Sequence, residues 1–317
     1  MIVFELVWNQ QQHWVGIFAH DAAAYTDQLG LALLNQELGS LSCFTIDDQK
    51  PHQHTAPFVV LETSSNGIIL PNTGRLHFQI QNASDIKQLN HLDMACGPWY
   101  TAVSTNKNTV NPSKPVLLEL LSLIVSDADT AALETTLTKA PQLMLNLLKL
   151  VNSVGMSSAT PARSIRQAIT LLGRRQLQRW LQLLLYAEQY GDDETTPVIL
   201  IAAAMRGKRL ALWAEQGWLG STSADEAFLC GMLSLLDRLF AEPLDQLLAP
   251  LPLEPDLRAA LLASEGPLGH ALKQLAALEA GDVHHPMLKP LLAKQASWIN
   301  TDLKAITWVH RLISESI

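Results

Sequence analysis

The spacing of apolar positions changes near residue 110. Before it, short apolar runs alternate with turn residues, a pattern that predicts β-strands over 2–8, 14–19, 58–62, 67–70 and 76–80. Two stretches, about 22–38 and about 84–92, have helical spacing instead, and Gly39 ends the first. We therefore expect residues 1–108 to form a small α+β domain.

After a polar segment with two prolines at 105–115, nearly all apolar positions follow a helical period. Leu143, Met144, Leu147, Leu148 and Val151, for example, share one helix face. Further helices are expected over 176–190, 196–216, 223–241, 255–263, 267–279 and 286–314. Residues 113–317 are thus predicted to form an all-α bundle of roughly nine or ten helices.

Composition narrows the class of protein. Apolar residues make up 48% of the 317, whereas charged residues make up 16%, so the chain can build cores and is not disordered. The net charge of −8 gives no general attraction for nucleic acid. Cys43, Cys96 and Cys230 form no CxxC pair, which argues against a disulfide scaffold and fits a cytoplasmic protein. Neither a signal peptide nor a membrane span is expected.

Candidate catalytic groups are sparse. Phosphate-binding loops, dinucleotide fingerprints, serine elbows and HExxH motifs are missing from the sequence. His52 and His54 have no third metal ligand at a suitable spacing. Asp47, Asp48 and Glu62 fit an exposed turn and a strand end, although an enzyme built from them and His52 is an alternative. We expect no cofactor.

Arginines cluster in one stretch of the predicted bundle. Between Ser157 and Ala187 the only charged side chains are Arg163, Arg166, Arg174, Arg175 and Arg179, which we call the arginine face. If a helix restarts after Gly173, its free N–H groups and these guanidinium groups could bind phosphate or a partner's carboxylates. A solvated helix face neutralised by acidic groups elsewhere is the alternative.

Two runs around this cluster resemble a known family. The run LKLVNS at 148–153, followed by SIRQAITLLGRRQLQRW at 164–180, is similar to the HDOD domain. More narrowly, it resembles the HDOD half of bacterial proteins that join an EAL domain to an HDOD domain in cyclic di-GMP signalling. The resemblance covers roughly residues 113–280 and implies the helical fold of HD-related domains.

The resemblance also bears on catalysis. Catalytic HD phosphohydrolases carry a G-L-L-H-D run whose His-Asp binds a divalent metal. Here the similar run is GMLSLLD at 231–237, with Ser234 and Leu235 at the His-Asp positions, and the earlier metal His would fall in 203–206, where none is present. Hydroxyl and aliphatic groups cannot replace imidazole and carboxylate ligands. The resemblance therefore implies a regulatory module that is not an enzyme.

Residues 1–108 depart from the EAL pattern. An EAL domain is a TIM-like barrel of about 240 residues, and this region has no Glu-Ala-Leu motif. It resembles either a shortened, degenerate EAL domain or an unrelated small α+β sensor domain. We expect a signalling protein that contacts another signalling protein, or itself, through the arginine face; a receptor for a cyclic dinucleotide or another phosphate ligand, without turnover, is the alternative. The final helix, with Trp298 and Trp308, packs on its own domain or forms a dimer seam.

Overall fold

The computed structural model describes residues 2–20, 41–46, 58–64, 67–102, 114–139, 198–292 and 294–314. The chain divides into two compact units. The first, called the barrel unit, comprises Met1–Ala102 and His270–His310. The second, called the helical unit, comprises Val103–Gly269 and Arg311–Ile317. The predicted helical domain ran to residue 317, so this division places most of the last helices with the N-terminal strands.

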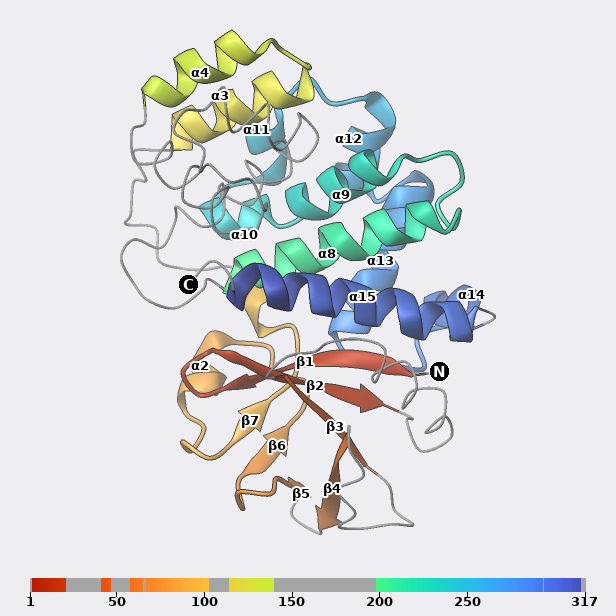
Figure 1. Ribbon diagram of the computed structural model, residues 1–317. Helices are drawn as coiled ribbons and strands as arrows, with labels where there is room; N and C mark the ends of the chain where they lie inside the picture. The colour runs from red at the N-terminus through yellow and green to blue at the C-terminus, as the bar shows by residue number, and fades with distance from the viewer. Residues whose placement is uncertain are drawn as a thin grey trace, which may run out of the picture. The chain divides into compact units, whose positions relative to one another are not determined.

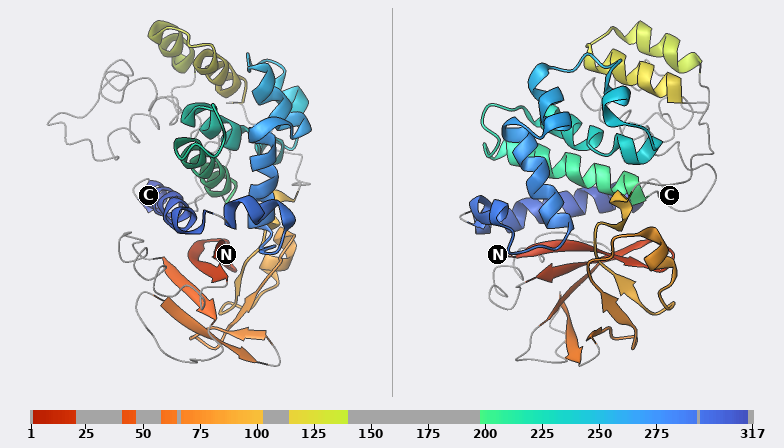
Figure 2. Two further views of the ribbon diagram at one scale, coloured as in Figure 1. Left: turned by 90° about the vertical axis from the view of Figure 1, so that its right-hand side faces the viewer. Right: turned by 180° about the vertical axis from the view of Figure 1, so that it is seen from behind.

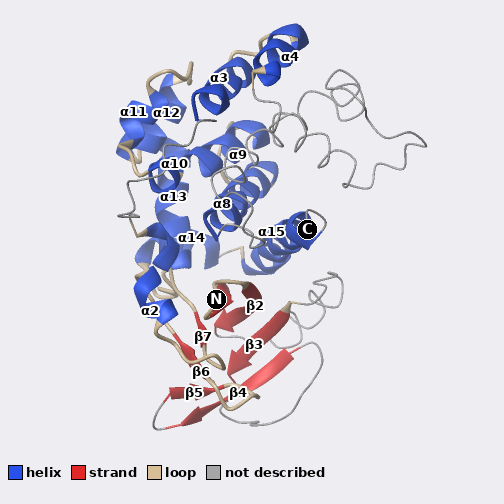
Figure 3. Cartoon of the chain, turned by 90° about the vertical axis from the view of Figure 1, so that its left-hand side faces the viewer, coloured by secondary structure: helices blue, strands red, loops and turns tan. Residues whose placement is uncertain are grey.

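Seven strands of the barrel unit form a closed barrel in the order β1 to β7 (Figure 1). They are β1 (Val3–Asn9), β2 (Trp14–His20), β3 (Ser42–Ile46), β4 (Phe58–Ser64), β5 (Gly67–Ile69), β6 (Arg75–His77) and β7 (Met94–Ala95). The pairs β2–β3, β3–β4 and β6–β7 are parallel. The pairs β1–β2, β4–β5, β5–β6 and the closing pair β1–β7 are antiparallel. Figure 3 shows in red that the described strands all belong to this barrel.

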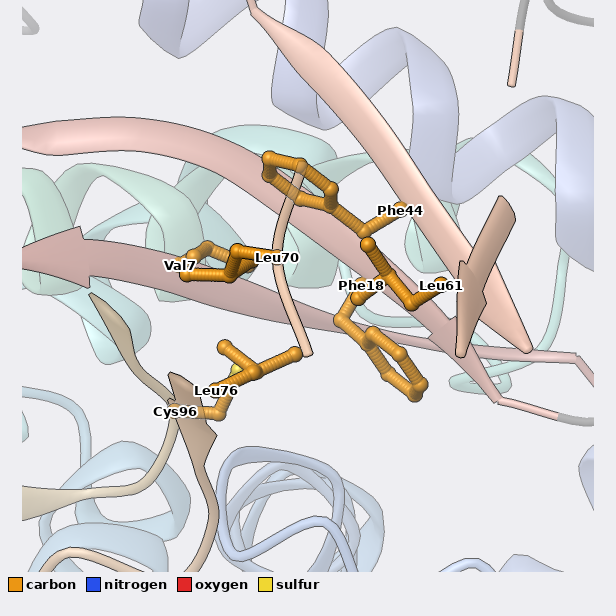
Figure 4. Packing of buried hydrophobic residues seen from close by; sticks show 7 residues of the cluster. All are labelled: Val7, Phe18, Phe44, Leu61, Leu70, Leu76 and Cys96. Carbon is orange, nitrogen blue, oxygen red and sulfur yellow. The ribbon is translucent and has the colours of Figure 1, made fainter. Parts of the chain in front are cut away.

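An apolar cluster of Val7, Phe18, Phe44, Leu61, Leu70, Leu76 and Cys96 is shared by the strands and their ends (Figure 4). Alternation along each strand explains the arrangement, because every second side chain points to the same face. Phe18 on β2, for example, shares its face with Gly16, whose added Cβ would lie 2.7 Å from a ring carbon of Phe44. A small barrel of this kind is filled by side chains rather than open.

The α+β prediction for residues 1–108 was wrong about this architecture. The pattern correctly indicated five strands, but β3 and β7 were missed and barrel closure was not anticipated. Closure depends on Trp8 pairing with Ala95 and Asn9 pairing with Met94, residues far apart in sequence. A local apolar pattern carries no information about such a pairing. The expected helix at 84–92 is the shorter α2 (Ala83–Lys87), and the one at 22–38 lies outside the described residues.

The last long helix, α15 (Gln295–Ser314), contacts the residue before β1 and the first residue of β2. Trp298 is fully buried, and its Nε1 donates a hydrogen bond of 2.8 Å to the carbonyl of Ile2. Farther along the helix, the His310 ring meets the Trp14 ring edge-on at 5.9 Å. These contacts use the apolar face of the amphipathic helix. Before it lie η4 (Pro286–Leu288) and α14 (Lys289–Leu292).

The helical unit holds α3 (Lys114–Val125), α4 (Thr130–Thr138), α8 (Val198–Glu215), α9 (Ala224–Leu233), α10 (Leu236–Phe240), α11 (Leu244–Leu248) and α12 (Pro255–Ala263). The next helix, α13 (Gly266–Glu279), begins in this unit and continues into the barrel unit. Figure 2 shows these helices from two further sides. Side-chain caps define two starts, because Asp129 accepts a hydrogen bond from Ala132 N and Ser223 accepts one from Glu226 N.

Most predicted helices in the described part of this region are present. The prediction of 196–216 corresponds to α8, and 255–263 coincides with α12, which has Pro255 in its first turn. The predicted helix 223–241 is instead two helices, α9 and α10, that meet at Ser234 and Leu235. Within the described residues, none of the helices combines the length and hydropathy needed to cross a bilayer.

Candidate functional site

The two residues at the predicted metal positions lie at the junction between α9 and α10. Ser234 caps the C-terminus of α9, and its hydroxyl donates a 2.7 Å hydrogen bond to the carbonyl of Gly231. Leu235 is 2% exposed, and its backbone (φ −119°, ψ 12°) interrupts the helix. One residue therefore ends the helix through its hydroxyl, and the next fills the core.

A buried cation lies next to this junction. Arg206 on α8 is 8% exposed, and its Nη1 donates a 3.0 Å hydrogen bond to the Ser234 hydroxyl. Arg206 belongs to the segment 203–206 in which the earlier metal His was looked for. Among the described residues, Ser234 and Leu235 supply neither an imidazole nor a carboxylate here, and a divalent cation would meet the like charge of Arg206. The contact is a hydrogen bond that joins two helices.

Close packing of α8 on α9 holds this geometry. A Cβ added to Gly231 would lie 2.4 Å from the backbone nitrogen of Gly207, so the two backbones touch at these glycines. Arg206 and Ser234 therefore belong to neighbouring turns of two helices in direct contact. Nearby, the pKa of the Cys230 thiol is raised to about 12, chiefly by burial and also by Glu226, while Arg206 lowers it. A protonated, buried thiol is a poor nucleophile and a poor metal ligand.

The arginine face lies outside the described residues. Arg163, Arg166, Gly173, Arg174, Arg175 and Arg179 all fall in the undescribed range 140–197. The undescribed range 47–57 likewise contains Asp47, Asp48, His52 and His54. Glu62 is described and lies on β4, opposite Ile69 of β5. Across the described ranges, no group of three His, Cys, Asp or Glu side chains could hold a metal ion.

The barrel unit contains two ionisable pairs that sequence reasoning missed. Glu5 on β1 is 3% exposed, and its Oε2 lies 2.5 Å from His20 Nε2 on β2. Asp93, directly before β7, lies 3.3 Å from His77 Nε2 on β6. Strand pairing brings each pair together, because Glu5 faces Phe18 two residues before His20, and His77 pairs with Ala95 two residues after Asp93. His20, His77 and Asp93 lie at or next to strand ends, whereas Glu5 lies within β1, where the apolar pattern gives no signal of a partner.

Asp93 is the centre of a hydrogen-bond network. Burial raises its pKa, but hydrogen bonds from Arg75 N–H, from the Asn90 side chain and N–H, and from His77 outweigh it and lower the pKa. The shortest of these joins Arg75 N to Asp93 Oδ1 at 2.8 Å. The carboxylate is thus held ionised while it ties the loop before β7 to β6. The network borders an open cavity of about 460 Å³.

Comparison with known proteins identifies the helical region. Residues 112–243 match the model of the HDOD domain, so the chain contains this domain, as the motifs at 148–153 and 164–180 predicted. The matched range includes α8 and α9 with the Arg206–Ser234 contact. No finding shows a degenerate EAL region in residues 1–108.

Two curated bacterial proteins are similar to part of the chain. Cyclic di-GMP phosphodiesterase CdgJ of Vibrio cholerae is 27% identical over 174 residues, which cover 55% of this chain and 40% of that protein. Uncharacterized protein YuxH of Bacillus subtilis is 26% identical over 174 residues, covering 54% and 42%. The chain therefore spans less than half the length of these relatives. It is related to a protein of cyclic di-GMP signalling.

Two solved structures are more distantly similar. One is a putative phosphohydrolase from Shewanella amazonensis, with a TM-score of 0.38 and 15% identity over 62% of this chain and 93% of that one. The other is an HDOD domain protein of unknown function from Geobacter sulfurreducens, with a TM-score of 0.32 and 17% identity over 61% and 70%.

Proposed function

We propose that this chain is a non-catalytic regulatory protein of bacterial signal transduction that acts through protein–protein contacts of its HDOD domain. The observation that carries the proposal is the hydrogen bond from Arg206 to Ser234, beside the buried Leu235. A guanidinium, a hydroxyl and an isobutyl group occupy a junction where a hydrolase of the related class needs metal ligands. Such groups cannot lower the pKa of a bound water, so hydrolysis at this junction has no activated nucleophile.

The arginine face supports the choice of protein contacts. Five arginines within 163–179 give a local positive charge in a chain whose net charge is −8. Guanidinium groups bind carboxylates through paired hydrogen bonds, so the complementary partner surface is acidic. The acidic remainder of a second copy of this chain has that character, as does an acidic signalling protein.

Two sets of measurements on the full chain test this proposal, one for catalysis and one for partner binding. Metal analysis and a phosphodiesterase assay of purified protein address catalysis, and stoichiometric divalent metal with turnover of cyclic di-GMP would contradict it. Sedimentation and affinity capture from the source organism then compare wild type with Arg174→Glu/Arg175→Glu. The matched control is Lys87→Glu/Lys273→Glu, which reverses two exposed charges outside the arginine face. We expect self-association or one specific partner to be lost only in the arginine variant.

A second candidate is a cyclic di-GMP receptor without turnover. The similarity to CdgJ, a cyclic di-GMP phosphodiesterase, favours it. A relative that has lost catalysis can still bind the nucleotide that its catalytic relatives hydrolyse. In this version the arginine face binds the phosphates. Calorimetry with cyclic di-GMP decides between the two candidates, since saturable heat that disappears in Arg174→Glu/Arg175→Glu supports the receptor, and its absence leaves the protein-contact proposal.

The origin of the barrel is also a proposal. We infer that residues 1–108 are a shortened EAL-derived region. The three parallel strand pairs of the closed barrel support this inference, whereas its four antiparallel pairs depart from a TIM-like barrel. An experimental structure with helices in the crossovers 21–40 and 47–57 is expected, and crossovers without helices would favour an unrelated sensor domain.

A further inference from the structure

The open cavity of the barrel unit has walls from two segments. One is the turn between β5 and β6 together with β6 itself, which contributes Arg75 and His77. The other is the loop between α2 and β7, which contributes Asn90, His91, Leu92 and Asp93. Its volume of about 460 Å³ lies within the range of small-molecule sites, roughly 300–1,000 Å³.

The two walls are fixed before any ligand arrives. Gly74 passes so close to the loop that an added Cβ would lie 2.0 Å from the carbonyl oxygen of Leu92. Asn72 links the same two segments. Its Nδ2 donates a hydrogen bond to Leu92 O at 3.2 Å, and its Oδ1 accepts one from Gly74 N at 3.2 Å. Asp93 adds the bonds to Arg75 N and His77 Nε2. A cavity with fixed walls loses little entropy when it binds.

The cavity lining carries one guanidinium, that of Arg75, and one carboxylate, that of Asp93, so anion binding depends on which groups remain available. Both oxygens of Asp93 already accept hydrogen bonds, so the one carboxylate of the lining is engaged within the wall. The Arg75 guanidinium and the His91 ring make no hydrogen bond or ion pair with any described residue, and both residues are exposed. Asn90 supplies an amide group to the lining, and Leu92, which is 37% exposed, supplies an apolar surface.

We propose that this cavity binds a small organic phosphate, with its phosphoryl group against Arg75 and His91 and its organic part against Leu92. A guanidinium donates two parallel hydrogen bonds to a phosphate, and imidazole N–H groups add further donors. His77 belongs to the wall, because its Nε2 donates to the Asp93 carboxylate. The site is separate in sequence from the arginine face, so it adds a ligand-binding function to the barrel unit.

The test is calorimetric titration of the full chain with inorganic phosphate and with phenyl phosphate. We expect saturable binding of both, with phenyl phosphate tighter because its ring contacts Leu92. Arg75→Gln and His91→Gln should each weaken phosphate binding about tenfold, since each removes a charge-assisted hydrogen bond. Lys87→Gln is the matched control, because it removes an exposed charge from the neighbouring helix α2 but does not line the cavity. Its effect should stay below about twofold.

Either of two results would overturn the proposal. One is the absence of saturable binding to wild type by both probes. The other is equal loss in the Arg75, His91 and Lys87 variants, which would indicate a general charge effect. Imidazole resonances of His77 and His91 should shift on titration of wild type, which locates the anion independently of the substitutions. None of these results bears on partner binding by the arginine face, so the two proposals can fail separately.

Discussion

The helical unit and the barrel unit each bury an ionisable side chain in a hydrogen-bond network, with opposite consequences. In the helical unit, Arg206 is 8% exposed and bonds to Ser234, between two helices whose backbones touch at glycines. In the barrel unit, Asp93 is 6% exposed, but its network borders an open cavity with exposed Arg75 and His91. The first network fills the junction at which metal ligands were expected, whereas the second lines an open cavity.

The difference shows that a buried charge does not by itself mark a functional site. What distinguishes the two networks is the space beside them and the donors that remain available there. Substitutions that act on the helix junction should change stability without changing ligand binding. Substitution of Asp93 should change both, whereas substitution of the exposed Arg75 or His91 should change ligand binding alone.

The largest expected effect concerns the packing of α15 in the barrel unit. Trp298→Ala should lower the free energy of unfolding by about 4 kcal/mol, because it leaves a large cavity and removes the hydrogen bond to Ile2. Urea denaturation followed by circular dichroism measures the change. Trp298→Phe keeps most of the ring volume and should cost about 2 kcal/mol. Equal costs for the two variants would contradict the cavity argument.

The next largest effect concerns the glycine contact of the helical unit. Gly231→Ala should destabilise by about 3 kcal/mol, because its Cβ would lie 2.4 Å from Gly207 N and the helices must separate. Gly207→Ala is the control in the same contact, since its closest neighbours lie at 3.1–3.2 Å and the helix propensity of alanine offsets the strain. Its net cost should be below about 1 kcal/mol. A larger cost for the Gly207 variant would show that the junction is packed differently.

The Asp93 network should give a distinct pH dependence. The folded-state pKa of Asp93 is lowered, so its ionised form stabilises the fold above the unfolded-state pKa of about 3.9. That contribution is lost as the pH falls through the folded-state pKa. Asp93→Asn should cost about 2 kcal/mol near neutral pH, since an amide cannot accept all four hydrogen bonds. It should also remove this component of the acid destabilisation.

A control for that prediction lies on α2. Asp85→Asn should lower the free energy of unfolding by only about 0.5 kcal/mol. Among the described side chains, the Asp85 carboxylate accepts hydrogen bonds only from its neighbours Asn82 and Ser84. Denaturation curves recorded across the acid range compare both variants with wild type. Parallel acid curves for wild type and Asp93→Asn would show that another group controls acid unfolding.

The smallest expected effect is the coupling between Arg206 and Ser234. A double-mutant cycle with Arg206→Met and Ser234→Ala should give an interaction energy of about 1 kcal/mol, the usual size for a single hydrogen bond to a charged donor. Partner binding by the arginine face should be unchanged in folded variants. A coupling near zero would mean that the contact has no energetic role.

Several elements could be predicted from the sequence because local rules govern them. Helix α12 begins at Pro255, whose fixed φ favours a first turn, and the prediction coincides with the structure. The HDOD motifs at 148–153 and 164–180 were also sufficient to identify a domain whose model matches 112–243. By contrast, α10 ends at Ala241 with a φ of 52°. Glycine usually occupies this conformation, so an alanine here gives no sequence signal for a helix end.

The candidate sites divide in the same way. Ser234 and Leu235 could be singled out from their place in the run 231–237, but their junction with Arg206 could not, because the bond spans 28 residues between two helices. The arginine face was visible in the sequence and stays a prediction. The cavity was not visible at all, since Arg75 and His91 are ordinary polar residues until β6 and β7 pair.

The sequence by itself determined the positions of most strands and helices, the presence of the HDOD domain and the groups at its metal positions. These follow from local periodicity, turn chemistry and residue identity, which need no knowledge of distant segments. Only the tertiary structure decided that seven strands close into a barrel, that Trp298 binds the carbonyl of Ile2 and that Asp93 organises a cavity. Each of these joins residues far apart in the chain, and their pairing is selected by the burial and hydrogen bonding of the whole fold.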